Sequence, residues 1–471
     1  MIYIKHHRHK WFLRKKDKKV KAQSKTTSGL MTEGIIWKQI LFFSIPLLVG
    51  NVFQQLYNMA DSIVVGNYVS DQALAAVGAC TPLINMMIGL FMGMATGAGV
   101  VISQYYGAEE HEKVKKAVHT AVAISIIGGF LLTILGICFA PSLVKVVGVS
   151  KEAYQDASLY LRLYFLGGIP FLIYNMGAGI LRAVGDSKRP LYYLMITSCL
   201  NVLLDIVFVV GFHWNIAGVG IATCIGQTVS AVMVIITLMK SHESYGIDIK
   251  KVKLDVTICK KMMWIGIPSG LQQSIIAFSN LMVQGFIGRF GDEAVAGCGA
   301  FVKIDGFILL PVLSFGLAAT TFVGQNIGAG RMDRVKKGSF IITAMSAGYI
   351  ILVSILLYLF RWNVVSVFSQ NEKVVSYGVH MLLYFVPLYF VTSVIQTACG
   401  ILRGFGNATV PMLIMVGNLC GVRLLWLNVM SHFCSKIDYV FMGYPLTWIT
   451  AFLCVVIYAA GKYVKKRRGL V

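Results

Sequence analysis

Two aspartates stand where the sequence is otherwise apolar. Asp61 follows the long apolar run ILFFSIPLLVGNVF, another apolar run begins just after it, and Asp205 ends the stretch NVLLD. An ionisable side chain at membrane depth is costly to keep and is therefore a functional hypothesis by default. The alternative is that the two carboxylates only hydrogen-bond to neighbouring helices.

Further polar side chains occur at helical spacing around these aspartates. Positions four or seven apart lie on one face of a helix, and this spacing relates three sets of residues: Gln54, Asn58 and Asp61; Asn201 and Asp205; Thr223 and Gln227. Asn175 adds one more carboxamide in another apolar segment. All of them belong to the first half of the chain.

The chemistry of this set is that of hard oxygen ligands. Carboxylate, carboxamide and hydroxyl oxygens suit a small cation such as Na⁺, and two close carboxylates can also share one proton. Two buried acids without a basic partner in the same half are costly to keep. This cost favours a cation or proton site over a purely structural pair.

The composition places these residues in a membrane protein. Of the 471 residues, 57% are hydrophobic and only 13% are charged, which is far more apolar than a soluble domain. A helix needs about 20 mostly apolar residues to cross a bilayer. The sequence predicts an all-α integral membrane protein with twelve transmembrane helices, at 36–63, 74–103, 117–140, 158–182, 190–211, 216–239, 262–288, 294–323, 339–360, 376–402, 411–430 and 439–463.

The net charge of +22 reflects membrane topology rather than nucleic-acid binding. The basic residues cluster in both tails and in alternate loops, at Lys113, Lys115 and Lys116, at Lys188 and Arg189, between residues 250 and 261, and between residues 331 and 337. Short loops rich in lysine and arginine stay on the cytoplasmic side. We therefore expect a multi-pass protein of the cell membrane with both termini in the cytoplasm.

The sequence contains an internal duplication. SQYYGAEEHEKVKKA after the second span matches GQNIGAGRMDRVKKG after the eighth, and Gln104 and Gln325 are 221 positions apart (325−104). GILRAVGDSKRP, from Gly179, matches GILRGFGNATVP, from Gly400, at the same separation. Because each half has an even number of spans, we expect two six-helix lobes related by a pseudo-two-fold axis along the membrane normal. We interpret the repeated glycines and arginines as turn and helix-end residues.

The duplication divides the chain into five predicted segments. These are a basic, disordered cytoplasmic tail (1–35), the N-lobe (36–240), a cytoplasmic linker (241–261), the C-lobe (262–463) and a basic cytoplasmic tail (464–471). The linker is either a passive tether or part of a gate. In the N-lobe, Gly89, Gly93 and Gly97 stand one turn apart, which predicts a small-residue packing face.

Taken together, these motifs resemble the multidrug and toxic compound extrusion (MATE) family of secondary transporters. The resemblance covers about residues 36 to 463 and rests on QQLYNMADSIVVG, the duplicated GILR element, SQYYGA and GQNIGA, NVLLD and GVGIATCIGQ. It implies export of cationic or amphipathic drugs in exchange for Na⁺ or H⁺, with the two lobes opening to opposite sides in turn. The implied partners are small organic molecules and membrane lipids, and a monomer is expected.

The resemblance also implies a cation site in the N-lobe. Matched residue by residue, that site consists of Asp61, Asn201, Asp205 and Thr223, with Gln54, Tyr57 and Asn175 nearby. Asn58 and Gln227, which share their helical faces, are expected as supporting polar groups. In some members a bend of the first span occurs at the position of Pro46, and a proline there does remove a backbone hydrogen bond.

A coupling site in the C-lobe is less clearly indicated. Other members carry an acidic residue in the seventh span, whereas this sequence has none between Pro268 and Gly288. Asp305, together with Gln272 and Gln273, is the candidate substitute.

Two other classes of protein are weighed against this interpretation. A lipid-linked precursor flippase or polysaccharide exporter of the same superfamily should carry several basic cavity residues, and only Lys303 and Arg423 are prominent mid-span bases here. An enzyme would need a motif such as HExxH or a catalytic dyad, and the sequence has neither. We therefore expect no catalytic residues and no cofactor besides the coupling ion.

Overall fold

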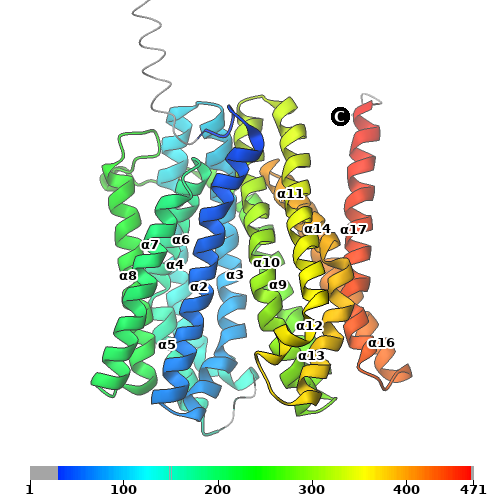
Figure 1. Ribbon diagram of the computed structural model, residues 1–471. Helices are drawn as coiled ribbons and strands as arrows, with labels where there is room; N and C mark the ends of the chain where they lie inside the picture. Colours follow the sequence, from blue (N-terminus) through cyan, green and yellow to red (C-terminus); the bar gives the residue numbers. More distant parts are fainter. Residues whose placement is uncertain (1–29, 148, 150, 468–471) are drawn as a thin grey trace, which may run out of the picture.

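The computed structural model describes residues 30–147, 149 and 151–467, and within them the regular secondary structure is helical. Residues 1–29 and 468–471, which belong to the two predicted tails, lie outside the described residues. Figure 1 shows the helices standing side by side as one bundle.

The described part of the first half forms seven α-helices and one π-helical turn. They are α2 (Ile36–Tyr68), α3 (Asp71–Gly107), α4 (His111–Val147), α5 (Tyr154–Leu166), α6 (Gly168–Ala183), α7 (Lys188–Asp205), η1 (Ile206–Gly211) and α8 (Asn215–Lys240). Helices α5 and α6 meet at an angle of 49° and together make one broken span.

The second half repeats this order with more breaks. It comprises α9 (Val256–Gly288), α10 (Asp292–Gly328), α11 (Met332–Leu359), α12 (Arg361–Ser366), α13 (Glu372–Phe385), η3 (Val386–Leu388), α14 (Tyr389–Gly404), α15 (Thr409–Val416), η4 (Gly417–Val422), α16 (Arg423–Phe433) and α17 (Asp438–Arg467). A short turn, η2 (Ile249–Lys251), lies in the linker between the halves.

Hydropathy and length identify most of the predicted spans in the described residues. Ten helices in the described part of the chain are long and apolar enough to cross a membrane, and there are eleven if the bent pair of α5 and α6 is counted as one span. Helix α9, the predicted seventh span, has 33 residues but carries Gln272, Gln273 and Asn280. It nevertheless stands beside α10 within the bundle (Figure 1) and packs along α3.

The two halves form two lobes. In Figure 1, α2 to α8 (blue to green) lie on one side and α9 to α17 (green to red) on the other. Each lobe has its own apolar core, one centred on residues such as Leu161 and Phe165 and the other on Phe301 and Phe385. The predicted two-lobe, all-α membrane fold is therefore confirmed.

Glycines bring the lobes into backbone contact at α3 and α9. A Cβ added to Gly93 would lie 2.1 Å from the Gly270 nitrogen, and one added to Gly97 would lie 2.2 Å from the Met262 oxygen. Such distances leave no space for any larger side chain. The packing face predicted from the glycine spacing is thus the contact between the two lobes.

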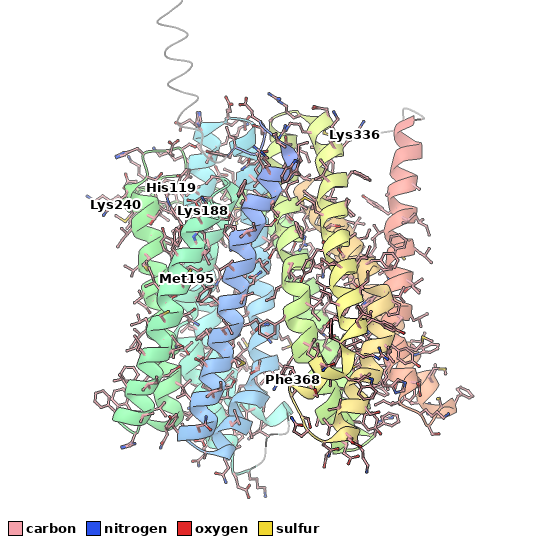
Figure 2. The ribbon with its side chains drawn as sticks, in the orientation of Figure 1. His119, Lys188, Met195, Lys240, Lys336 and Phe368 are labelled. Carbon is pink, nitrogen blue, oxygen red and sulfur yellow. The ribbon has the colours of Figure 1, made fainter. Side chains whose placement is uncertain are left out.

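One end of the bundle carries many of the repeated basic residues. Lys188, Lys240 and Lys336 all lie at this end in Figure 2, with His119 nearby, whereas Met195 lies nearer the middle and Phe368 toward the opposite end. We call this the basic end. The C-terminal end of α17 is on the same side (Figure 1).

The repeated glutamines join the two lobes at the basic end. Gln104 Nε2 donates to the Gly404 oxygen at 2.9 Å, and Gln325 Nε2 donates to the Ala183 oxygen at 2.8 Å. The acceptors are themselves 221 positions apart (404−183), so the two bonds are symmetry-related. Gln325 also accepts a bond from the Met31 nitrogen at 2.7 Å. We call Gln104 and Gln325 the glutamine latch.

The linker is attached to the N-lobe. Helix α9 begins at Val256, so the last residues of the predicted linker are helical. Before that point, the Asp248 nitrogen donates to His119 Nε2 at 3.2 Å, and the Asp255 nitrogen donates to Thr120 Oγ1 at 3.2 Å. The linker is therefore hydrogen-bonded to α4.

Candidate cation site

Three helices of the N-lobe bring the central predicted residues together. Asp61 comes from α2, Asn201 and Asp205 from the last turns of α7, and Thr223 from α8. Their exposed fractions are 6%, 2%, 0% and 2%, in chain order. The four side chains therefore form a buried polar cluster.

Asn201 bridges the two carboxylates. In the amide orientation that satisfies both of its ends, the Asn201 nitrogen donates to Asp61 Oδ1 at 2.9 Å and to Asp205 Oδ2 at 3.3 Å. The amide oxygen then accepts from the Thr223 backbone nitrogen at 3.2 Å. One neutral amide thus holds two acids side by side and fixes both to α8.

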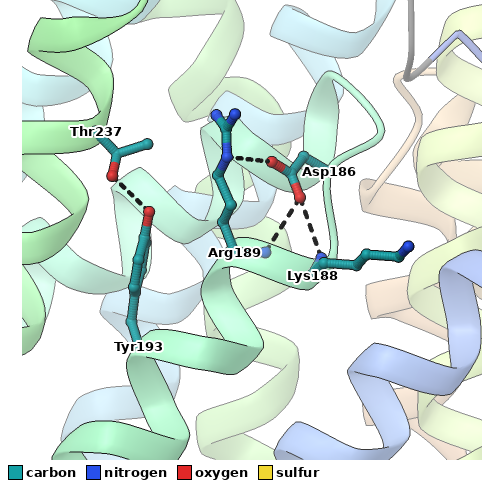
Figure 3. Close-up of polar contacts among 5 residues, drawn as sticks. All are labelled: Asp186, Lys188, Arg189, Tyr193 and Thr237. Atoms are coloured by element: carbon teal, nitrogen blue, oxygen red, sulfur yellow. Dashed lines mark hydrogen bonds and ion pairs between the residues drawn. The ribbon is translucent and has the colours of Figure 1, made fainter.

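A ladder of hydroxyl contacts aligns α7 with α8 above this cluster. Tyr193 and Thr237 share a hydrogen bond of 2.5 Å (Figure 3), and one helical turn further along α7, Ser230 Oγ donates to Thr197 Oγ1 at 2.9 Å. Asn201 is the next residue in this i, i+4 series. The register of the two helices at the site is therefore set by polar contacts on two preceding turns.

Asp186 fixes the start of α7. Its Oδ1 accepts bonds from the Lys188 and Arg189 nitrogens, each at 3.1 Å, and its Oδ2 pairs with Arg189 Nε at 3.2 Å (Figure 3). A carboxylate at a helix N-terminus satisfies backbone donors that have no partner within the helix. At its other end, α7 passes directly from Asp205 into the π-helical turn η1, an irregularity often found at functional sites.

Two buried oxygens of the cluster have no hydrogen-bond partner. They are Asp205 Oδ1 and Thr223 Oγ1. Buried polar atoms are nearly always paired with protein, water or an ion. Among the described residues, no group of three or more His, Cys, Asp or Glu side chains could hold a metal. An ion at this site would therefore use two carboxylates together with neutral amide and hydroxyl oxygens, which is a donor set suited to a monovalent cation.

Of the predicted supporting residues, some lie near the cluster and others lie outside it. Tyr57 faces Asp61 and Thr223, and Gln227 lies against Gly167, where a Cβ would be 2.4 Å from Gln227 Oε1. Gln54 and Asn58 are exposed and stay outside the cluster. Asn175 also stays outside, because its amide donates to the Phe171 oxygen of its own helix at 2.8 Å.

Two tyrosines near the site were not predicted. Tyr160 and Tyr164, one turn apart on α5, lie within electrostatic range of Asp61. Their i, i+4 spacing was visible in the sequence. Nothing in the sequence indicated that α5 would turn this face toward α2.

The comparison with family models decides the identity. The model described as MatE matches residues 46–207 and 268–427, which together make up more than half of the chain. The chain belongs to the MATE family. This match confirms the predicted family, and with it a transporter rather than an enzyme. Its two matched ranges fall one in each lobe.

Individual MATE relatives are distant but match nearly end to end. The chain is 26% identical over 447 residues to the probable multidrug resistance protein YoeA of Bacillus subtilis, covering 92% of this chain and 95% of that one. It is 22% identical over 425 residues to the multidrug export protein MepA of Staphylococcus aureus, covering 89% and 93%. A solved structure of the outward-facing conformation of a multidrug resistance MATE family transporter superimposes with a TM-score of 0.86, at 22% identity, covering 94% and 99%.

The C-lobe of this MATE chain holds its acidic residue differently. Tyr389, which is fully buried, donates from its hydroxyl to Asp305 Oδ1 at 2.6 Å. Gln272 is buried on α9 with its Oε1 unpartnered, whereas Gln273 is exposed. The three C-lobe candidates thus do not form a counterpart of the paired acids. Pro46 lies within α2, which continues as one helix from Ile36 to Tyr68.

Proposed function

We propose that this MATE transporter exports cationic or amphipathic organic compounds in exchange for Na⁺ or H⁺, with Asp61 and Asp205 as the coupling pair. The observation that carries the proposal is the buried pair of carboxylates bridged by one amide. No lysine or arginine contacts either acid in the described part of the chain. The pair therefore needs a cation from outside the protein.

Simple electrostatics supports one cation at the pair. The contacted carboxylate oxygens lie within about 6 Å of each other, because both approach the same Asn201 nitrogen, at 2.9 and 3.3 Å. Two unit charges at that separation repel by about 3 kcal/mol at an effective dielectric constant of about 20. Relief of that repulsion would raise the affinity of the pair for one positive charge by about 100-fold, compared with a single carboxylate.

The contacts between the lobes suggest which side is open. Hydrogen bonds that join the lobes lie at the basic end, such as the glutamine latch, or near mid-bundle, such as Asn51 Nδ2 to Ser314 Oγ at 3.3 Å. Positively charged ends face the cytoplasm. We assign the basic end and both termini to the cytoplasm of the cell membrane, and the structure to an outward-open state.

In the proposed cycle, the outward-open protein takes a cation at Asp61 and Asp205 from outside. Cation binding shifts α2, with Pro46 as the site of bending, and releases the drug to the exterior. Because the effect of one ligand on the other is reciprocal, the drug must weaken cation binding by the same factor. The multidrug names of YoeA and MepA support drug-like substrates.

The flippase alternative would need accessible basic groups in the cavity. Arg423 is buried and hydrogen-bonded to protein groups, and Lys303 is one exposed residue. Neither arrangement supplies the several cations that a pyrophosphate requires. The N-lobe acids are also of the wrong charge for such a substrate.

The test is ethidium transport in proteoliposomes under an imposed Na⁺ gradient and, separately, an imposed H⁺ gradient. Wild type should transport the dye under one of the two gradients, and Asp61→Asn should lose transport at equal protein incorporation. Asp305→Asn is the matched control and should keep the dependence on the gradient. Equal transport by Asp61→Asn and wild type would contradict the proposal.

A further inference from the structure

The C-lobe contains a buried arginine without an acidic partner. Arg423 is 1% exposed, and no salt bridge between described residues includes it. Its Nη1 donates to Asn280 Oδ1 at 3.2 Å, and its Nη2 donates to Thr447 Oγ1 at 3.3 Å. The guanidinium carbon lies 4.3 Å from the centre of the Tyr444 ring. A buried charge held only by neutral groups is costly and needs an explanation.

The duplication explains where this arginine lies. Arg423 begins α16, and its partners come from α9 and α17. These three helices are the repeat counterparts of α7, α2 and α8, which build the N-lobe site. Tyr444 stands 221 positions after Thr223 (444−223). Arg423 stands 222 positions after Asn201 (423−201), and the π-helical turn η4 immediately before it accounts for one additional residue. The guanidinium therefore occupies the position at which the N-lobe has the bridging amide.

The charges of the two lobes differ accordingly. The N-lobe cluster contains two carboxylates and no base. In the C-lobe, Asp305 is connected to Arg423 through packed aromatic rings. Tyr389 donates to Asp305 and stacks on Trp448, with ring centres 6.0 Å apart. Trp448 contacts Tyr444, with ring centres 6.3 Å apart, and the guanidinium covers Tyr444. One acid and one base leave this part of the C-lobe without net charge.

We propose that Arg423 is a built-in cation that fills the C-lobe counterpart of the N-lobe cation site, so that the C-lobe binds no exchangeable Na⁺ or proton. This inference rests on the proposed function of Asp61 and Asp205. It assigns the whole of the coupling to the N-lobe. Among the described residues, the titratable groups whose charges act on the guanidinium are Tyr444 and Cys420.

The first test counts cations on the purified full-length protein. We would measure Na⁺ bound at saturation and protons released when ethidium binds, in wild type and in the double variant Asp61→Asn/Asp205→Asn. The proposal expects one cation for wild type and none for the double variant. One cation remaining on the double variant would overturn it. No cation on wild type would refute the proposed function and would still agree with an inactive C-lobe.

A second comparison tests the guanidinium itself. In the Asp61→Asn/Asp205→Asn background, Arg423→Gln should create a new cation requirement at Asp305, of one Na⁺ or proton per protein. Arg423→Lys keeps the charge and should bind none. If Arg423→Gln folds and binds no cation, the arginine does not exclude the ion and the proposal is wrong. If Arg423→Gln does not fold, the cation count on the double variant still decides the question.

Discussion

The glutamine latch should control how often the basic end opens. Gln325 is fully buried and makes two bonds that connect it to residues of the first half, to the Ala183 oxygen and from the Met31 nitrogen. Each net hydrogen bond contributes about 1 kcal/mol, and a buried carbonyl left without its donor costs about 1–3 kcal/mol. We call the state in which the two lobes touch at the basic end the joined state, and the state in which they part there the separated state. Gln325→Ala should destabilise the joined state by about 2–4 kcal/mol, which shifts the equilibrium toward the separated state by about 30-fold to 1,000-fold.

Gln104→Ala should have a smaller effect. Gln104 is half-buried and makes one such bond, to the Gly404 oxygen at 2.9 Å. Loss of about 1 kcal/mol corresponds to about a fivefold change. In the separated state water solvates the same groups, so each variant acts on the joined state.

Hydrogen exchange of the protein in nanodiscs measures this opening. Amides at the basic ends of α3 and α10 should exchange about 30-fold faster or more in Gln325→Ala, and about fivefold faster in Gln104→Ala. Asn326→Ala is the matched comparison. Asn326 is equally buried but makes one bond to the first half, to the Met31 oxygen, and one to its own helix, so its effect should be smaller than that of Gln325→Ala. Equal effects of Gln325→Ala and Asn326→Ala, or no change in exchange, would refute the reasoning.

Three further predictions concern separate contacts. Asn201→Leu removes the amide N–H groups that stabilise both ionised carboxylates. The pair should then bind Na⁺ or a proton about tenfold more tightly or more, measured by ion titration, while protein yield stays within twofold. Gly97→Leu places atoms against the Met262 oxygen, 2.2 Å from the added Cβ. The packing of α3 on α9 should then lose stability, seen as a lower melting temperature and slower dye transport, and unchanged melting would argue against the contact. His119→Phe removes the acceptor of the Asp248 nitrogen, and limited proteolysis should cleave the linker several times faster, with transport revealing whether the linker gates or only tethers.

The polar cluster illustrates what the sequence alone could predict. Helical spacing in apolar segments predicts a polar set in the N-lobe, and the family resemblance implies a site at Asp61, Asn201, Asp205 and Thr223. The structure brings these four residues together. Gln54 and Asn58 share the helical face of Asp61, yet they are exposed. A helical wheel gives the face of a residue and does not give the depth at which a neighbouring helix begins to cover that face.

Contacts between distant segments were beyond prediction. The duplication identified Gln104 and Gln325 as equivalent positions and predicted no role for them. Their bonds across the lobes depend on how α3 and α10 meet α14 and α6, which no local pattern encodes. Arg423 was noted only as a mid-span base, because its correspondence to Asn201 depends on the π-helical turn that precedes it.

The most direct test of the account is the mutual effect of drug and cation at equilibrium. We would measure the ethidium dissociation constant of purified wild type and Asp61→Asn with and without saturating Na⁺, and at two proton concentrations. The account predicts that one of the two cations weakens ethidium binding to wild type, and that this factor falls to one in Asp61→Asn. An equal factor in both proteins would show that coupling does not pass through Asp61 and would contradict the central claim.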